Sequence, residues 1–124
     1  MSKQNTAPDL TTDQIQTLVL STLEDLKAQE VTTIDVRGLS PLTDVMVVAS
    51  GRSTRHVKSM ADNLAHAAKS NGHAPLGIEG EREAEWVLVD LNDIIVHLML
   101  PRIRAFYNLE KLWSASNKRL ARGT

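Results

Sequence analysis

The stretch SGRSTRHV at residues 50–57 has the residue types of a phosphate-binding turn. It follows an apolar run and precedes a helical pattern, so the free N–H groups and the dipole of the helix start would attract an anion, and two arginines could reinforce that attraction. The commoner use of such residues is structural. Gly51 permits a tight strand-to-helix turn, and Ser53 or Thr54 can cap the helix. The stretch therefore indicates either a nucleotide site or only a helix start.

Magnesium-dependent nucleotidyl transfer needs carboxylates that hold the metal against the phosphates, commonly two on one strand with one residue between them. The sequence has no Asp-x-Asp motif. Asp90 and Asp93 are three positions apart across an expected turn, and forming that turn is the commoner role for at least one of them. Ser50 and Ser53 lack the Gly-x-Ser-x-Gly elbow, although the members of a catalytic triad need not be close in sequence. The sequence argues against an enzyme and assigns no catalytic residue.

The sequence indicates no metal or cofactor site. Its four histidines lie far apart, and no pair has the spacing of a helical metal site. We expect His56 and His66 to be solvated helix positions. The absence of cysteine excludes disulfides, thiolate chemistry and Cys-ligated zinc, and it fits the reducing cytosol.

Length predicts one compact domain, and the absence of cysteine and of a membrane-length apolar run predicts a soluble cytoplasmic protein. A chain of 124 residues can bury a single core. Its 14 basic and 15 acidic side chains leave a formal charge of -1, so there is no global electrostatic footprint for nucleic acid, and any contact with RNA would be local. No apolar run approaches the length of a membrane span. We expect a flexible leader at residues 1–10, a domain at 11–114 and a mildly basic tail at 115–124.

Residue patterns predict helices and strands that build a mixed sheet. Thr11 and Gln14 form a capping box that starts an amphipathic helix, and Asn71-Gly72 ends a second helix that begins after the turn at Gly51. The expected strands are 31–36, 45–49, 76–78, 86–90 and 94–100, and a last helix runs from Pro101 to Trp113. The fold class is α/β or α+β, with a mixed sheet of about five strands flanked by helices.

The hairpin of strands 86–90 and 94–100 has two different faces. In either plausible two-residue loop, the residue numbers of two directly paired residues add up to an odd number. Because side chains alternate along a strand, the same side chains then share a face in both registers. One face is wholly aliphatic and must face the core. The other carries Trp86, Leu88, Asp90, Ile95, His97 and Met99. Either a helix covers this second face, or it is a partner-binding surface.

The placement of the aromatic residues favours a partner-binding surface. All four aromatic residues fall in the last third of the chain, whereas residues that only filled a core would be scattered. Phe106 and Trp113 share a helical stripe that we expect to pack inward, which turns Tyr107 toward the second face. Arg102 and Arg104 would then supply a polar rim.

Several motifs together resemble the ribosomal silencing factor family, also called Iojap-like. The resemblance runs from about the first helix to Trp113, and the order of the motifs is specific although no single motif is. The motifs are DVRG at 35–38, LTD at 42–44, ASGRSTRHV at 49–57, GIEG at 77–80, EWVLVD at 85–90, IVH at 95–97 and RAFYNLEKLW at 104–113.

The resemblance implies a nucleotidyltransferase-like fold without the catalytic carboxylates and a function that is not enzymatic. Members of the family bind the large ribosomal subunit, chiefly through one of its proteins at the intersubunit face. They sterically block joining of the small subunit, which represses translation when nutrients are scarce. The resemblance also implies a homodimer in the free state. An assembly chaperone of the large subunit is the alternative function, with a nucleotide-binding protein as a third.

The resemblance also assigns residues to the contact with the ribosomal protein. Trp86, His97, Met99 and Tyr107 match positions that the family would use. Leu88, Asp90, Ile95 and Arg104 follow from the geometry of the same face. The basic tail at 115–124 could make a minor contact with ribosomal RNA.

Overall fold

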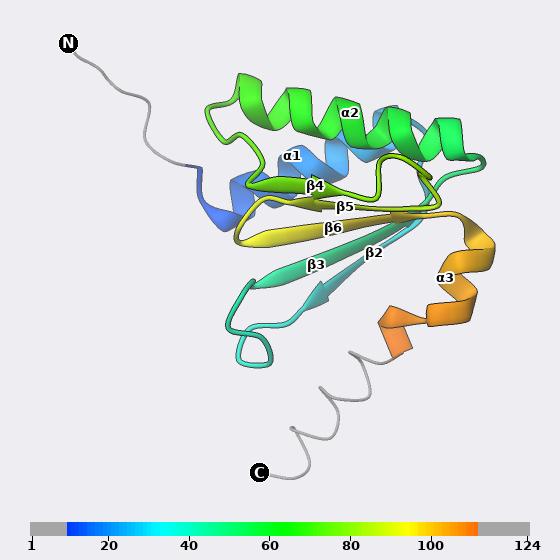
Figure 1. Cartoon of the computed structure of the whole chain (residues 1–124). Coiled ribbons are helices and arrows are strands. Elements are labelled where there is room, and N and C mark those ends of the chain that lie inside the picture. The colour runs from blue at the N-terminus through cyan, green and yellow to red at the C-terminus, as the bar shows by residue number, and fades with distance from the viewer. Residues whose placement is uncertain (1–9, 112–124) are drawn as a thin grey trace, which may run out of the picture.

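A mixed sheet of five strands organises residues 10–111, which are the residues that the computed structural model describes (Figure 1). The sheet and its flanking helices confirm the predicted fold class. The elements in chain order are α1 (Thr12–Asp25), β2 (Gln29–Asp35), β3 (Val45–Ser50), α2 (Thr54–Ser70), β4 (Gly77–Glu79), β5 (Trp86–Asp90), β6 (Ile94–Met99) and α3 (Pro101–Tyr107).

The strand order is β2-β3-β6-β5-β4, with one parallel pair at its centre. β3 runs parallel to β6, and the other three pairings are antiparallel. In the β5–β6 hairpin the N–H of Leu91 donates to the carbonyl of Ile94, which leaves Asn92 and Asp93 as a two-residue loop. Asn92 has a φ of 75°, a conformation that asparagine tolerates. The residue numbers of paired residues in β5 and β6 therefore have an odd sum, as predicted, and both predicted faces of the hairpin are confirmed.

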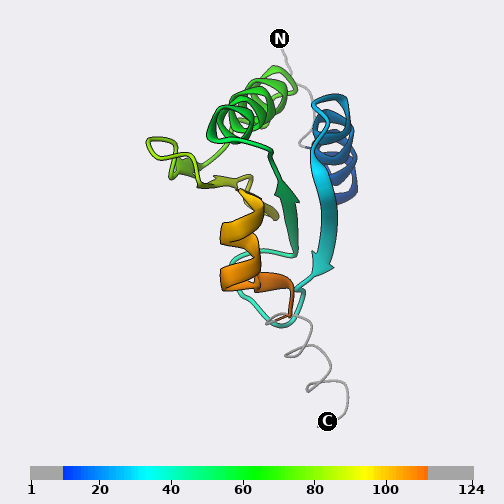
Figure 2. The ribbon, with the colours of Figure 1, turned by 90° about the vertical axis from the view of Figure 1, so that its right-hand side faces the viewer.

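Helices α1 and α2 cover one face of the sheet, and α3 lies on the opposite side (Figures 1 and 2). The predicted capping box starts α1, since Thr11 and Gln14 exchange hydrogen bonds of 2.9 and 3.1 Å. The main core lies between the two helices and the aliphatic face of β3, β5 and β6. Within residues 10–111, no helix is long and apolar enough to cross a membrane.

Two elements have a boundary more than one residue from the prediction, and the other strand boundaries agree within one residue. β2 begins at Gln29 instead of Val31, and a register shift between Gln29 and Thr32 accommodates Glu30 at a φ of 47°. The prediction of one continuous helix from Pro101 to Trp113 is wrong, because the helix is interrupted at Asn108, although residues 109–111 are helical again as predicted. α3 ends at Tyr107, because Asn108 adopts the left-handed conformation with φ 47° and ψ 57°. Trp113 lies outside the described residues.

The turn between β3 and α2 is a tightly packed helix start. Ser53, one of the two predicted capping residues, caps α2 by accepting a hydrogen bond of 3.1 Å from the N–H of His56. The ring of His56 accepts from the N–H of Arg52 at Nδ1 and therefore donates from Nε2 to the carbonyl of Leu26, at 2.9 and 2.8 Å. His56 thus ties the turn to the end of α1, and the prediction of a merely solvated position is wrong. His66 is exposed, as predicted.

Gly51 is required for space, and this gives the first testable prediction. A Cβ at this position would lie 2.8 Å from Cγ2 of Val57 and 2.9 Å from Cε of Met60. We expect Gly51→Ala to lower the free energy of unfolding by about 1–3 kcal/mol because it overpacks this contact. Gly77→Ala is the matched control, since a Cβ there meets nothing within 4 Å. Denaturant unfolding measures both, and equal stability of the two variants would contradict the packing role of Gly51.

Candidate functional site

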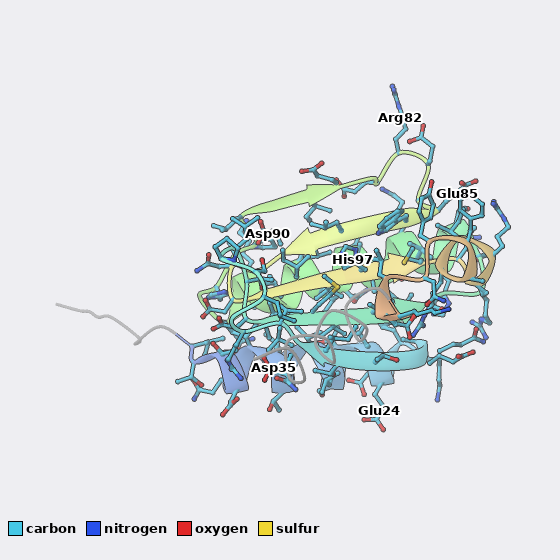
Figure 3. All side chains as sticks on the ribbon, turned by 90° about the horizontal axis from the view of Figure 1, so that it is seen from below. Glu24, Asp35, Arg82, Glu85, Asp90 and His97 are labelled. Carbon is cyan, nitrogen blue, oxygen red and sulfur yellow. The ribbon has the colours of Figure 1, made fainter. Side chains whose placement is uncertain are left out.

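The sheet face that points away from α1 and α2, here called the open face, is only partly covered (Figure 3). A small second core lies on this face, where Ile103 and Leu109 pack against a cluster that extends along β2 and β3. Its buried members are Ile34, Val36, Met46, Val48 and Met99. The interpretation that a helix covers this face is therefore correct in part, and the interpretation that a partner binds it stays a prediction. A helix covers one end, and apolar side chains remain accessible on the rest.

Four rings form a continuous series from the interior to the solvent, here called the aromatic ladder: His97, Trp86, Tyr107 and Phe106. The ring centroids are 5.8 Å apart for His97 and Trp86, 4.9 Å for Trp86 and Tyr107, and 5.0 Å for Tyr107 and Phe106. The exposed fraction is 7% for His97, 52% for Tyr107 and 80% for Phe106, with Trp86 partly buried. Separations of this size are favourable for tilted and edge-to-face aromatic pairs.

His97 holds the indole of Trp86 in place. Trp86 Nε1 donates a hydrogen bond of 2.9 Å to Nδ1 of His97, so His97 must be the neutral tautomer that carries its proton on Nε2. Burial lowers the pKa of His97 from its ordinary value of 6.5 to about 4, because desolvation disfavours the charged ring. His97 therefore stays neutral at physiological pH, and the N–H of Trp86 is satisfied before any partner binds.

The loop between β4 and β5 fixes the backbone of Trp86. A Cβ on Gly80 would overlap the carbonyl oxygen of Trp86, and Gly80 has a φ of 89°, so only glycine fits here. Glu85 connects this loop to α3 through its carbonyl, which accepts from the N–H of Leu100, and through an ion pair of 2.9 Å with Arg102. Side chain and backbone contacts together set the orientation of Trp86.

Arg104 is buried and does not form the predicted polar rim. Its Nε and Nη2 bind the two carboxylate oxygens of Glu110 at 2.8 and 2.9 Å, its Nη1 donates to the hydroxyl of Ser50 at 2.9 Å, and Nη2 also reaches Thr32 at 3.2 Å. The hydrogen bond from Arg104 lowers the pKa of Glu110. Only 8% of Arg104 is exposed. Arg102 is exposed, as a rim residue should be.

The other predicted site residues divide into accessible and buried positions. Leu88, Asp90 and Ile95 share the open face and are partly exposed, which agrees with their predicted placement. Asp90 also accepts a hydrogen bond of 2.9 Å from the N–H of Asn92, so its predicted turn-forming role is confirmed. Met99 is fully buried, because the chain that follows β6 folds over it. Its expected accessibility is wrong.

Phe106 is the accessible residue that the sequence analysis placed incorrectly. It was expected to pack inward with Trp113, but it is 80% exposed. The signal was Asn108, since asparagine is one of the few residues that adopt the left-handed conformation readily. Because α3 ends there, the residues after Asn108 do not lie on the helical stripe of Phe106. The partnership of Arg104 with Glu110 was missed for the same reason.

Comparisons with known proteins agree on one family. The family model described as "Ribosomal silencing factor during starvation" matches residues 9–122, which extends beyond the motifs that end at Trp113. The ribosomal silencing factor of Zymomonas mobilis is 48% identical over 96 residues, which are 77% of this chain and 72% of that protein. A crystal structure of a Chromobacterium violaceum protein has a TM-score of 0.83 at 38% identity and covers 85% of this chain and 88% of that one.

A mouse relative carries a name that refers to assembly. The protein named "Mitochondrial assembly of ribosomal large subunit protein 1" is 35% identical over 100 residues, which are 78% of this chain and 44% of the mouse protein. The similarity therefore concerns one part of that longer protein.

The buried His97 predicts an acid-sensitive fold. Because the pKa of His97 falls from 6.5 to about 4 on folding, the unfolded chain binds more protons between these values, and stability must decrease as pH falls through this window. We expect a loss of roughly 3 kcal/mol in the free energy of unfolding between pH 6.5 and pH 4. The measurement is denaturant unfolding at a series of pH values.

His97→Asn isolates this effect, since asparagine keeps a hydrogen-bond acceptor near the position of Nδ1 but does not titrate. We expect its stability to change much less than that of the wild type between pH 6.5 and pH 4.5. Glu110 contributes mainly below that range, because its folded pKa lies below its ordinary value of 4.5. His66→Asn, at an exposed position, is the control. If the stability of His97→Asn and of the wild type changed equally with pH, the assignment of the acid sensitivity to His97 would be rejected.

Proposed function

This chain belongs to the family of ribosomal silencing factors, and on that premise we propose that it binds the large ribosomal subunit at its intersubunit face. The bound protein sterically blocks joining of the small subunit, and this represses translation under nutrient limitation. The contact is chiefly with one large-subunit ribosomal protein. The aromatic ladder is the observation that supports this binding role most directly.

The ladder has the properties of an interface centre. Tryptophan and tyrosine are enriched among the residues that dominate binding energy, and here they lie next to an exposed phenylalanine. Trp86 already has a hydrogen-bond partner in His97 and a fixed backbone, so binding does not have to order it. Such preorganisation favours a stable complex over a transient one.

Burial sorts the proposed contact residues into two groups. Tyr107 and Phe106 are accessible, and Trp86, Leu88, Asp90 and Ile95 are accessible in part, so these six carry the proposed contact. The remaining three expected residues are buried and act from beneath the surface: His97, Met99 and Arg104. In this arrangement His97 orients Trp86, and Met99 supports the sheet below α3.

The proposed mechanism is steric and requires no catalysis. Ser50, the first residue of the stretch that resembles a phosphate loop, already accepts a hydrogen bond from Arg104. Asp90 holds the hairpin turn, and Asp93 accepts a hydrogen bond of 3.1 Å from Thr12. These side chains are committed to structural contacts, which supports a protein that acts by occupying a surface.

We also propose that the free protein is a homodimer and that the dimer opens before it binds the ribosome. An exposed aromatic patch on a small protein favours self-association through the same residues.

A minor contact between the basic tail and ribosomal RNA remains part of the proposal, and it concerns residues outside 10–111.

The second candidate function is assembly of the large subunit, which the name of the mouse relative favours. The two functions use the same partner but differ in their consequences. Loss of an assembly chaperone leaves immature large subunits, whereas loss of a silencing factor leaves mature subunits that continue to join under starvation. Sucrose-gradient profiles of a deletion strain separate these outcomes.

The proposed function is tested by mixing purified large and small subunits with increasing amounts of the protein. We expect the protein to sediment with large subunits and the fraction of joined ribosomes to fall. Unchanged joining at saturating protein would reject the steric mechanism.

Single substitutions test the proposed surface. Trp86→Ala and Tyr107→Ala should each weaken binding to the large subunit by on the order of 2 kcal/mol, or about 30-fold in Kd, because each removes an aromatic anchor. Leu42→Ala is the control, since Leu42 is an apolar residue that is 77% exposed in the loop before β3, outside the ladder. Binding is measured by co-sedimentation. A folded Trp86→Ala variant with wild-type affinity would show that the ladder is not the contact surface.

A further inference from the structure

Helix α3 is too short to be stable without contacts to the rest of the protein. It has seven residues, and its first residue follows Leu100, which makes no side-chain capping bond. Isolated helices of this length are unstable in water, so contacts with the sheet must place α3. Pro101, Ala105 and Phe106 are exposed, and Ile103 is only partly buried. Arg104 is the one residue of α3 that is buried.

Arg104 joins α3 to three other segments. Its guanidinium reaches Thr32 on β2, Ser50 at the end of β3 and Glu110 beyond α3. Four hydrogen bonds from one planar group fix both the position and the rotation of the helix. The rotation decides where the other side chains of α3 point.

The left-handed turn at Asn108 makes the contact with Glu110 possible. The N–H of Asn108 donates to the carbonyl of Arg104 at 2.8 Å and closes the helix. The chain bends at Asn108, and beyond the bend the carboxylate of Glu110 binds the guanidinium and Leu109 packs in the second core. We call Arg104 and Glu110 together the α3 clamp.

We propose that Arg104 and Glu110 are positioning residues of the binding surface. They do not contact the partner, but they hold α3 in the rotation that places the ring of Tyr107 4.9 Å from that of Trp86. The inference rests on the proposed function, because it concerns the same surface. It replaces the expected direct contact of Arg104 with a role that acts through Tyr107.

The geometry supports this role in two ways. Tyr107 lies three positions after Arg104 and is the last residue of α3, so a small rotation of the helix moves its ring away from Trp86. Arg104 is 8% exposed and is neutralised by Glu110, which leaves little of its charge for a partner. A buried pair of this kind is weak evidence for stability, and fixing one arrangement is its better-attested use.

The first arm of the test uses the free protein and nuclear magnetic resonance. In the wild type, the indole N–H signal of Trp86, assigned with Trp86→Phe, should show cross-peaks to the ring of Tyr107. We expect Arg104→Gln to lose these cross-peaks while the fold persists. Glu110→Gln is the second variant, since its partly exposed side chain makes misfolding less of a concern. Val19→Ala is the control, because Val19 is buried on the other side of the sheet.

The second arm measures co-sedimentation with purified large subunits at a temperature where every variant is folded. Arg104→Gln should weaken binding about tenfold, and Val19→Ala, which also lowers the melting temperature, should not. The decisive comparison is the double variant Arg104→Gln/Tyr107→Ala. If Arg104 acts through Tyr107, this variant binds no more weakly than Tyr107→Ala alone.

Each outcome decides the inference. Lost cross-peaks together with a non-additive double variant support it. Retained cross-peaks in Arg104→Gln, additive losses in the double variant, or an equal loss in Val19→Ala overturn it. If the wild-type protein does not bind large subunits, the proposed function fails. The cross-peaks alone then decide whether the α3 clamp places Tyr107 on Trp86.

Discussion

The parallel pairing of β3 with β6 is the constraint on which the rest of the structure depends. It brings the carboxyl ends of both strands, Ser50 and Met99, to the same edge of the sheet. The chain leaves this edge twice, once into α2 and once into α3, and the two helices go to opposite faces (Figure 2). The long helix joins α1 and completes the main core, whereas the short one covers only the end of the open face. The aromatic ladder lies at this same end, because Trp86 pairs with Met99 and both Tyr107 and Phe106 belong to α3.

In open α/β sheets, this kind of edge commonly holds a ligand, because the two connections diverge and leave a crevice between them. A cavity of about 330 Å³ does lie here, lined by Ser50, Arg104 and Glu110 among others. Among the described residues that line it, the only buried cation is Arg104, which is already paired with a carboxylate, so an anionic ligand would have to displace Glu110. The phosphate-like turn at residues 50–57 thus retains its helix-starting geometry, while the neighbouring cation is used to hold α3. The polar groups at this edge therefore attach a helix to the sheet.

The sequence was sufficient for features that depend on local periodicity. Strict alternation over the hairpin identified both of its faces, and the capping residues Thr11 and Ser53 placed two helix starts. It was insufficient where one residue redirects the chain. Asn108 ends α3 four helical positions after Arg104, and that single backbone conformation buries Arg104, covers Met99 and exposes Phe106. Helical spacing could not indicate this, because a helix pattern continues on both sides of Asn108. The proposed contacts with the ribosome stay predictions, since they depend on a surface that this chain does not contain.

The exposure of Phe106 follows from the α3 clamp. Burying a phenylalanine side chain is worth about 1.5–3 kcal/mol, so an 80% exposed ring needs a structural reason. If the helix continued past Asn108, Phe106 and Leu109 would lie on one stripe and could enter the second core together. The turn at Asn108 instead places Leu109 in the second core and Glu110 against Arg104, and it leaves Phe106 exposed in an edge-to-face contact with Tyr107. The same hydrogen bonds that fix α3 therefore keep an apolar ring in water. Such an arrangement is stable enough to fold, and it becomes favourable once a second surface covers the ring.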